Sequence, residues 1–215
     1  MAMTLTDENK TLEIIANNVA KCQRCRLHEG RTKSVPGSGN PTADILFIGE
    51  GPGKNEDLQG EPFVGAAGRL LEEMLAAIKL SRKDVFITNV VKCRPPDNRD
   101  PEPDEVLACT EPWLNAQVEL INPKLIVTLG RHSLERFIPG KRISECHGKP
   151  MRAAAPGGTR RVFYPVYHPA AALYQGSLKE TLMTDFKRIP VVLKAVDSAA
   201  EKNKLLEEMA APDQL

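Results

Sequence analysis

A short run of four apolar residues, 45–48, constrains the fold more than any other stretch of the chain. The run ends at a glycine, as is typical of a short strand that is buried on both faces. The glycine-rich sequence at residues 49–53 permits a sharp turn after this strand, and a helical pattern follows from about residue 66 to residue 79. Because open α/β sheets bind ligands beyond the carboxyl ends of their strands, Glu50 stands where a functional residue is expected.

Three further apolar runs predict three more strands. Asn89 ends the second run, residues 124–130 form the third, and His168 follows the fourth. Helical patterns separate these runs, and alternation of this kind is typical of a parallel sheet. Since the carboxyl ends of parallel strands lie at one edge, the sequence predicts that Glu50, Asn89 and His168 meet there.

The bulk composition is that of an ordinary globular protein. Hydrophobic residues make up 41% of the 215 residues and charged residues 27%, and the net charge of +1 does not by itself indicate nucleic-acid binding. No apolar run approaches the ~20 residues that span a bilayer, and residues 1–10 lack the apolar core of a secretory signal. We therefore expect a cytoplasmic protein with one domain at residues 1–200 and a charged tail at residues 201–215.

Four of the five cysteines form two pairs that predict a metal site. Cys22 and Cys25 form a C-x2-C motif at the end of a helical pattern, and two thiolates at this spacing can reach one ion or one cluster corner. Cys93 and Cys109 form the second pair. All-thiolate coordination suits either zinc or an iron–sulfur cluster, and spacing alone does not choose between them. Cys146 stands apart, and we expect it to be a free thiol.

Four motifs follow one another along the chain: Gly49-Glu50-Gly51-Pro52-Gly53 with Glu56-Asp57, Gly60-Glu61-Pro62-Phe63-Val64-Gly65, Thr88-Asn89-Val90-Val91-Lys92-Cys93-Arg94-Pro95, and His168-Pro169-Ala170-Ala171. Together with the four cysteines, they resemble the family 4 uracil-DNA glycosylases, the type that carries a [4Fe–4S] cluster. The resemblance extends from Cys22 to about Phe186. It implies an α/β fold, a three-layer α/β/α sandwich around a four-stranded parallel sheet. It also implies a cluster bound by Cys22, Cys25, Cys93 and Cys109.

The resemblance further implies an enzyme of base excision repair. Such a DNA glycosylase hydrolyses the N-glycosidic bond of uracil, the product of cytosine deamination, in single- and double-stranded DNA. Its partners are uracil-containing DNA and, as product, free uracil, and an abasic site remains in the DNA. We expect a monomer without membrane contact, which associates with the nucleoid when it acts on DNA.

The chemistry of uracil excision assigns roles to residues at the strand ends. The base must leave the stack, and the departing uracil anion needs a hydrogen-bond donor, for which His168 is the catalytic candidate. Glu50 would be the second catalytic residue, because a carboxylate can position or activate the attacking water or stabilise the cationic sugar. Asn89 suits the base edge, since an amide accepts from N3–H and donates to O4. Phe63 would stack on the base.

DNA contact is predicted from basic residues and one apolar loop. The basic residues expected near the pocket, which would contact phosphates, are Lys92, Arg94, Arg99, Lys141, Arg142, Lys149, Arg152, Arg160 and Arg161. Backbone amides around Gly51 and Gly53 would contact uracil or phosphate. The loop at residues 170–174 is small and apolar, and we expect Leu173 or Tyr174 to fill the gap left by the flipped base.

Two other functions fit parts of the sequence. A non-catalytic or covalently trapping uracil-DNA-binding module would keep the fold and the cluster. The trapping relatives carry Gln where this chain has Gly51 and a histidine-bearing insertion after the second strand, whereas residues 92–103 contain no histidine, which favours turnover. A zinc-stabilised nucleotide-binding domain would use the glycine-rich turns, but the first turn lacks the Lys-Ser/Thr of a P-loop and the G-x-G-x-x-G of a dinucleotide site.

Overall fold

A six-stranded mixed sheet forms the centre of the molecule, whose computed structural model describes residues 11–210 and their side chains as far as Ala199. The strands are β1 (Ser38–Gly39), β2 (Ile45–Gly49), β3 (Phe86–Asn89), β4 (Leu125–Leu129), β5 (Met151–Ala154) and β6 (Arg160–Val166), in the spatial order β1-β3-β2-β4-β6-β5. β3, β2, β4 and β6 are parallel, whereas β1 and β5 pair antiparallel at the two edges. The predicted four-stranded parallel core is confirmed, and two short edge strands extend it.

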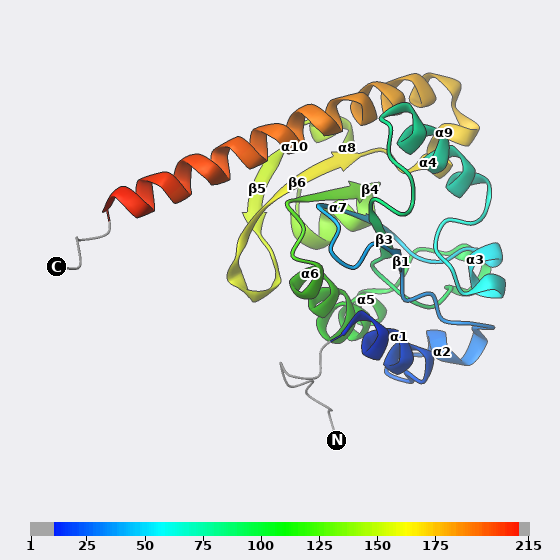
Figure 1. Ribbon diagram of the computed structural model, residues 1–215. Helices are drawn as coiled ribbons and strands as arrows, with labels where there is room; N and C mark the ends of the chain where they lie inside the picture. The colour runs from blue at the N-terminus through cyan, green and yellow to red at the C-terminus, as the bar shows by residue number, and fades with distance from the viewer. Residues whose placement is uncertain (1–10, 211–215) are drawn as a thin grey trace.

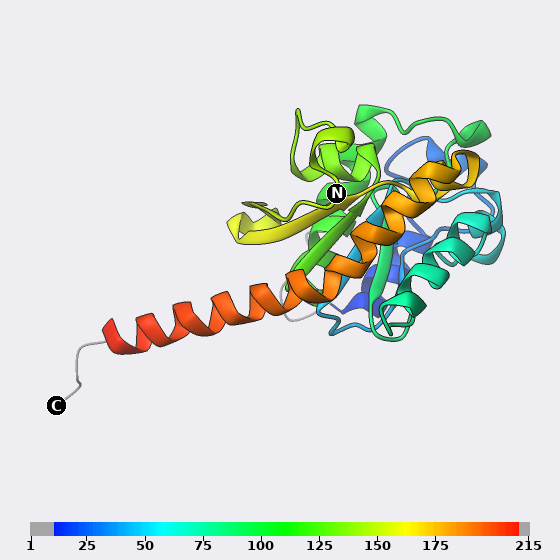
Figure 2. The ribbon, with the colours of Figure 1, turned by 90° about the horizontal axis from the view of Figure 1, so that it is seen from above.

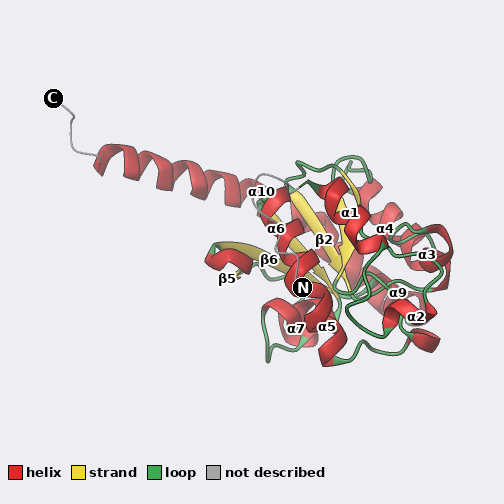
Figure 3. Cartoon of the chain, turned by 90° about the horizontal axis from the view of Figure 1, so that it is seen from below, coloured by secondary structure: helices red, strands yellow, loops and turns green. Residues whose placement is uncertain are grey.

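Helices cover both faces of the sheet, so the predicted three-layer arrangement is also confirmed (Figures 1 and 3). One face carries α4 (Ala66–Ala77), α9 (Pro169–Tyr174) and α10 (Gly176–Ala210). The other carries α1 (Leu12–Ala20), α5 (Pro103–Cys109), a π-helical turn (Thr110–Leu114), α6 (Asn115–Ile121) and α7 (Arg131–Phe137). Shorter helices are α2 (Leu27–Gly30), α3 (Lys54–Gln59) and α8 (Ile143–Cys146), with 3₁₀ turns at Pro96–Asn98 and Pro156–Gly158.

The continuous apolar run of β2 follows from its position between two helical layers. Successive side chains of a strand point to opposite faces of the sheet, so a strand covered on both faces needs apolar residues throughout. Phe47 packs in the core on the α10 side, where its ring lies 5.8 Å from the ring of Phe186. Its neighbours Leu46 and Ile48 pack in the opposite core together with Phe163. All residues of β2 are buried.

The parallel strands end at the same level. Gly49 at the end of β2 pairs with Asn89 at the end of β3, and Leu129 of β4 pairs with Val166 of β6. The chain passes from β2 to β3 on one side, while β4 lies on the other side of β2. Such a switch in strand order opens a crevice at the carboxyl ends, where α/β proteins bind ligands.

Helix α10 projects well beyond the sheet (Figures 1 and 2). A proline inside a helix removes one backbone hydrogen bond and can kink it, yet α10 runs past Pro190 without a break from Gly176 to Ala210, into the segment predicted as a tail. Pro190 is exposed, whereas its neighbours Phe186, Ile189 and Val192 are buried, so packing on one side holds the helix together while water can reach the other. Among the described helices, none is both long and apolar enough to cross a membrane.

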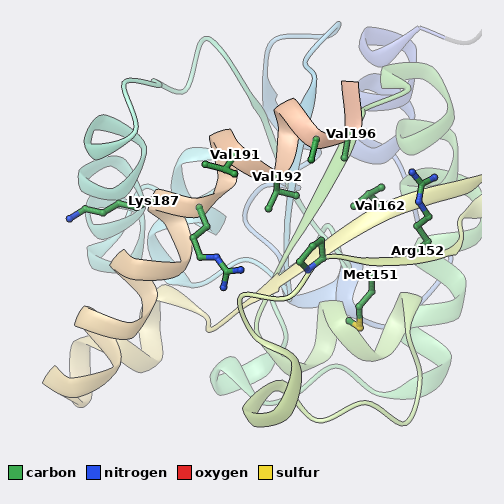
Figure 4. A pocket seen from close by; sticks show the side chains of 10 residues that line it. Met151, Arg152, Val162, Lys187, Val191, Val192 and Val196 are labelled. Carbon is green, nitrogen blue, oxygen red and sulfur yellow. The ribbon is translucent and has the colours of Figure 1, made fainter. Parts of the chain in front are cut away.

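A pocket of about 410 Å³ lies between α10 and the β5–β6 hairpin (Figure 4). Its lining is mainly apolar with three basic residues, and comprises Pro150, Met151, Arg152, Val162, Lys187, Arg188, Val191, Val192, Ala195 and Val196. Val162, the residue of β6 that lines this pocket, lies in the first half of the strand. His168 follows the other end of β6, its carboxyl end. The pocket is therefore separate from the crevice at the strand ends.

Candidate active site

Gly49 at the end of β2 allows two side chains from other segments to meet beside the backbone. A Cβ atom on Gly49 would lie 2.4 Å from Asn89 Oδ1 and 2.7 Å from Phe63 Cζ, far inside contact distance. Only glycine, which has no Cβ, permits this close approach. The end of β2 thus forms the floor on which Asn89 and Phe63 converge.

Asn89 presents an unpaired acceptor at this floor. The residue is 1% exposed, and its Oδ1 finds no hydrogen-bond partner within residues 11–199. A buried acceptor without a partner costs about 1–3 kcal/mol, so such an atom is typical of a site that a ligand completes. The backbone carbonyl of Asn89 is held by Lys92, whose Nζ donates to it at 2.7 Å.

Phe63 is held in a left-handed backbone conformation, with φ at 55°. This conformation is costly for an aromatic residue and persists only where the surroundings enforce it. Arg82 does so by donating to the carbonyl of Pro62 at 2.9 Å and to that of Phe63. The Phe63 ring, 6% exposed, lies against the His168 ring with 5.6 Å between centroids and 29° between planes.

His168 is the N-cap of α9, and the first turn of this helix orients its ring. Its Nδ1 accepts a hydrogen bond from the backbone N–H of Ala170 at 3.1 Å, so in the neutral ring the proton resides on Nε2. Burial lowers the pKa of His168 to about 4, while nearby Glu56 acts in the opposite direction. The ring is therefore neutral at pH 7 and carries a donor on Nε2.

Glu50 lies beside a second histidine that was given no role in the sequence predictions. Burial raises the pKa of the Glu50 carboxyl above its ordinary value, while nearby His132 acts in the opposite direction. Nε2 of His132 lies 3.5 Å from Glu50 Oε2 and 3.2 Å from Asp100 Oδ1. Asp100 comes from the proline-rich loop between β3 and α5, so this loop reaches the crevice as well.

Glu56 fixes the two glycine-rich loops to each other. Its carboxylate accepts from the backbone N–H groups of Gly53 at 3.1 Å and of Val64 and Gly65 at 2.9 Å each. The Gly53 amide, predicted to contact uracil or phosphate, is therefore engaged within the protein. Gly51 lies close to Val91, since a Cβ on Gly51 would be 2.8 Å from Val91 Cγ2.

The four predicted cysteine ligands line one pocket. Cys22 and Cys25 enter it from the segment between α1 and α2, Cys93 from the loop after β3, and Cys109 from the end of α5. Burial raises the pKa of each of the last three thiols, to about 12 for Cys109. Two donors face the sulfurs, because Arg31 Nη1 lies 3.2 Å from Cys93 Sγ and the Lys92 amide 3.2 Å from Cys109 Sγ.

The thiols are arranged more widely than a single zinc ion requires. Zinc–sulfur bonds of about 2.3 Å in a tetrahedron bring the four sulfurs within about 4 Å of one another. Among the described residues, Glu50, Asp100 and His132 form the one set of three or more ligand atoms within 4.8 Å of one another, and the cysteines form none. A polynuclear cluster is larger than one ion and fits the wider spacing.

Comparison with known proteins identifies the family of the chain. A sequence model described as the uracil DNA glycosylase superfamily matches residues 36–188. The chain belongs to this superfamily. It is 48% identical over 195 residues to a Type-4 uracil-DNA glycosylase of Saccharolobus solfataricus, covering 85% of this chain and 86% of that protein. Type-4 uracil-DNA glycosylases of Archaeoglobus fulgidus and Thermotoga maritima are 48% and 43% identical, over 84% and 85% of this chain and 92% and 95% of their own lengths.

The residues predicted to contact DNA in this superfamily member lie in different places. Leu173 and Tyr174 are 47% and 92% exposed on α9, directly after His168, and Arg94 lies on the loop after Cys93. Arg160 and Arg161 begin β6, at the opposite end of a strand about 20 Å long, so the structure does not bring them to the crevice. Arg161 instead donates to the carbonyl of Pro123.

Lys92 is also placed differently from its prediction. It is 1% exposed and donates to Thr88 Oγ1 at 2.6 Å, to the Asn89 carbonyl, and to Gln117 Oε1 at 2.7 Å. The expectation that Lys92 contacts phosphate is therefore wrong, because strand β3 and helix α6 enclose its side chain. Burial lowers the pKa of this lysine to about 7.

His132 is the main residue of the crevice that the sequence predictions missed. It stands two residues after Gly130, at the end of the third apolar run, so the rule that singled out the residues after the other strands also applies to it. Gly130 approaches the site closely too, since a Cβ on it would lie 2.9 Å from His168 Cβ.

Proposed function

We propose that the protein is a uracil-DNA glycosylase, which hydrolyses the N-glycosidic bond of uracil in DNA and releases free uracil. The observation that carries this proposal is the buried, unpaired Oδ1 of Asn89 beside the Phe63 ring and the neutral His168. These groups match a flat base that has an N–H donor on one edge and an acceptor carbonyl. The naming of the relatives as Type-4 uracil-DNA glycosylases supports the same conclusion.

Uracil is selected by the direction of its hydrogen bonds. Asn89 Oδ1 accepts from uracil N3–H, and the Asn89 amide group donates to O4. Cytosine has an acceptor at N3 and a donor at position 4, so both pairs would be mismatched. A buried site of this kind discriminates by about 10⁴-fold, because the mismatched polar groups stay unpaired.

Bond cleavage leaves negative charge on the departing base. His168 Nε2–H donates to uracil O2, where that charge develops, without having to give up its proton. A neutral imidazole is suited to this role, and the low pKa of His168 keeps it neutral throughout the physiological range. Phe63 stacks on the base face and, held by Arg82, is already in position before the base arrives.

Glu50 acts on the sugar side of the bond. Its carboxylate positions the water that attacks the sugar carbon, and its negative charge stabilises the cation-like sugar. This role needs the ionised form, which burial disfavours and which nearby His132 favours. Leu173 or Tyr174, exposed on the helix that follows His168, fills the gap that the flipped nucleotide leaves in duplex DNA, and Arg94 contacts a phosphate.

A [4Fe–4S] cluster held by Cys22, Cys25, Cys93 and Cys109 completes the protein in this proposal. When bound, the cluster supplies a cross-link between the segment before α2, the loop after β3 and the end of α5. Cys93 and Cys109 are buried thiols of raised pKa, and they would ionise on binding the positively charged iron. Cys93 follows Lys92 and Asn89 along the chain, so a bound cluster would also support the segment that carries the base-reading residue.

The test is a single-turnover incubation with a labelled oligonucleotide that holds one uracil, followed by alkaline cleavage of abasic sites. A thymine oligonucleotide and the variants Glu50→Ala and His168→Ala run in parallel, and we expect cleavage at uracil only, slowed about 10²- to 10⁴-fold in each variant. Tight binding of uracil-DNA without release of uracil, by a brown protein loaded with its cluster, would instead indicate a binding module. Formation of a stable protein–DNA adduct would indicate a trapping protein.

A further inference from the structure

His132 connects two carboxylates that belong to separate segments of the chain. It is the second residue of α7, and its side chain is 25% exposed. The two oxygens that face its Nε2 belong to Glu50, at the end of β2, and to Asp100, in the proline-rich loop. β4 therefore contributes to the crevice just as the three neighbouring parallel strands do.

Asp100 is itself anchored from both sides. Its carboxylate contacts the guanidinium of Arg131, the residue before His132, and Arg99 donates to its backbone carbonyl at 2.9 Å. Arg99 in turn pairs with the buried Glu105 on α5. The outer carboxylate is thus held in place by α7 and by the base of its own loop, so it offers His132 a fixed partner.

The position of His132 between two acceptors determines which form of the ring fits. Both oxygens lie at ion-pair distance from Nε2, although neither contact has the geometry of a hydrogen bond within the described residues. Because ionised carboxylate oxygens only accept, a proton on Nε2 suits this position between them. The charged and titratable groups that face Glu50 are His132, Asp100 and Arg131, and His132 also faces His168. Among these groups, His132 and Arg131 favour the ionised form of Glu50, and Asp100 disfavours it.

We propose that His132 is a positioning residue of the excision reaction, which holds the Glu50 carboxylate in place and joins it to Asp100 on the proline-rich loop. This inference rests on the proposed function, since it names a further residue of the same site. His132 occupies the Oε2 side of Glu50, which leaves Oε1 for the attacking water. It also favours the negative charge that Glu50 needs, while Asp100 holds the same ring nitrogen from the proline-rich loop.

The test compares pH profiles of single-turnover uracil excision in the cluster-loaded, full-length protein. His132→Gln removes the ring and its charge, Asp100→Asn removes the outer carboxylate, and Glu135→Gln on the exposed side of α7 is the matched control. The acid limb of the profile reports ionisation of Glu50. We expect this limb to move up by about one pH unit in His132→Gln and down in Asp100→Asn, because the first variant loses a cation and the second an anion near Glu50.

The opposite directions separate an electrostatic and positioning role from a general loss of structure. We also expect the rate at the pH optimum to fall about tenfold in His132→Gln and to stay unchanged in Glu135→Gln. Equal acid limbs in the wild type and His132→Gln overturn the inference, and so do shifts of the same sign in the two site variants. If His132→Gln does not fold, the direction in which the acid limb moves in Asp100→Asn decides the inference by itself: a downward shift supports it and an upward shift overturns it. A wild-type protein that releases no uracil at any pH contradicts the proposed function itself.

Discussion

Replacing Gly49 by alanine tests whether base recognition depends on the close approach of Asn89 and Phe63 to the backbone at the end of β2. The new methyl group would lie 2.4 Å from Asn89 Oδ1 and 2.7 Å from Phe63 Cζ, whereas ordinary contacts begin near 3.4 Å. At least one neighbour must therefore shift by about 1 Å, which for a well-packed interior costs about 1–3 kcal/mol of the free energy of unfolding. A displacement of this size in a group that reads the base reduces the rate about 10²-fold. We expect the Gly49→Ala protein to fold and to lose most of its activity.

The measurement is the single-turnover rate constant of uracil excision, together with the midpoint of thermal unfolding. Gly176→Ala is the matched control, because a Cβ on Gly176 would meet no described atom within 4 Å and its backbone needs no left-handed conformation. A Gly49→Ala protein whose excision rate stays within threefold of the Gly176→Ala rate would show that Asn89 and Phe63 are not fixed by this floor. That result would refute the reasoning on base recognition.

Three further predictions concern the base edge, the DNA wedge and the cysteine region. Asn89→Asp replaces the amide donor by a carboxyl, so uracil excision should fall about 10²- to 10⁴-fold while cytosine excision becomes measurable in the same assay, since a buried protonated Asp can donate to cytosine N3. Leu173→Ala should slow excision from duplex DNA about tenfold and leave single-stranded substrate unaffected, and equal rates on both substrates would exclude Leu173 as the wedge. Glu105→Gln should cost about 1–2 kcal/mol of unfolding free energy at pH 7, because Arg26 and Arg99 lose their shared carboxylate. Hydrogen bonding to Arg99 lowers the pKa of Glu105 to about 2, so this stabilisation is complete above about pH 4.5 and is lost as the pH falls toward 2. Between these pH values, the free energy of unfolding should therefore fall less steeply with pH in the Glu105→Gln variant than in the wild type.

The parallel core could be predicted because its strands are short, apolar on both faces and separated by helical patterns. The positions of Glu50, Asn89 and His168 follow from the same pattern, since each residue is the last of a parallel strand or lies within two residues of its carboxyl end. The edge strands β1 and β5 were not predictable in this way. They have two and four residues, and neither has the apolar sequence of a strand buried on both faces.

The side-chain contacts around the site depend on tertiary structure that the sequence does not encode locally. Asp100 lies in a proline-rich loop without periodicity, so nothing near it in sequence indicates that it meets His132. Lys92 and Arg161 were expected to contact phosphates because they belong to groups of basic residues predicted to lie near the pocket. Lys92 turns inward instead, because Thr88, Asn89 and Gln117 together offer three oxygen acceptors in the interior.

The carboxylate of Glu56 has a consequence for how this part of the chain can change in evolution. It joins the loop before α3 to the loop before α4 through three backbone amides, so the two glycine-rich motifs form one unit although they are apart in sequence. One residue inserted into α3 would rotate everything after it by about 100° and pull these amides away from the carboxylate. We therefore expect substitutions on the exposed face of α3 to be tolerated among homologues. Insertions and deletions between Glu56 and Gly65 should not be tolerated, because they would break these hydrogen bonds.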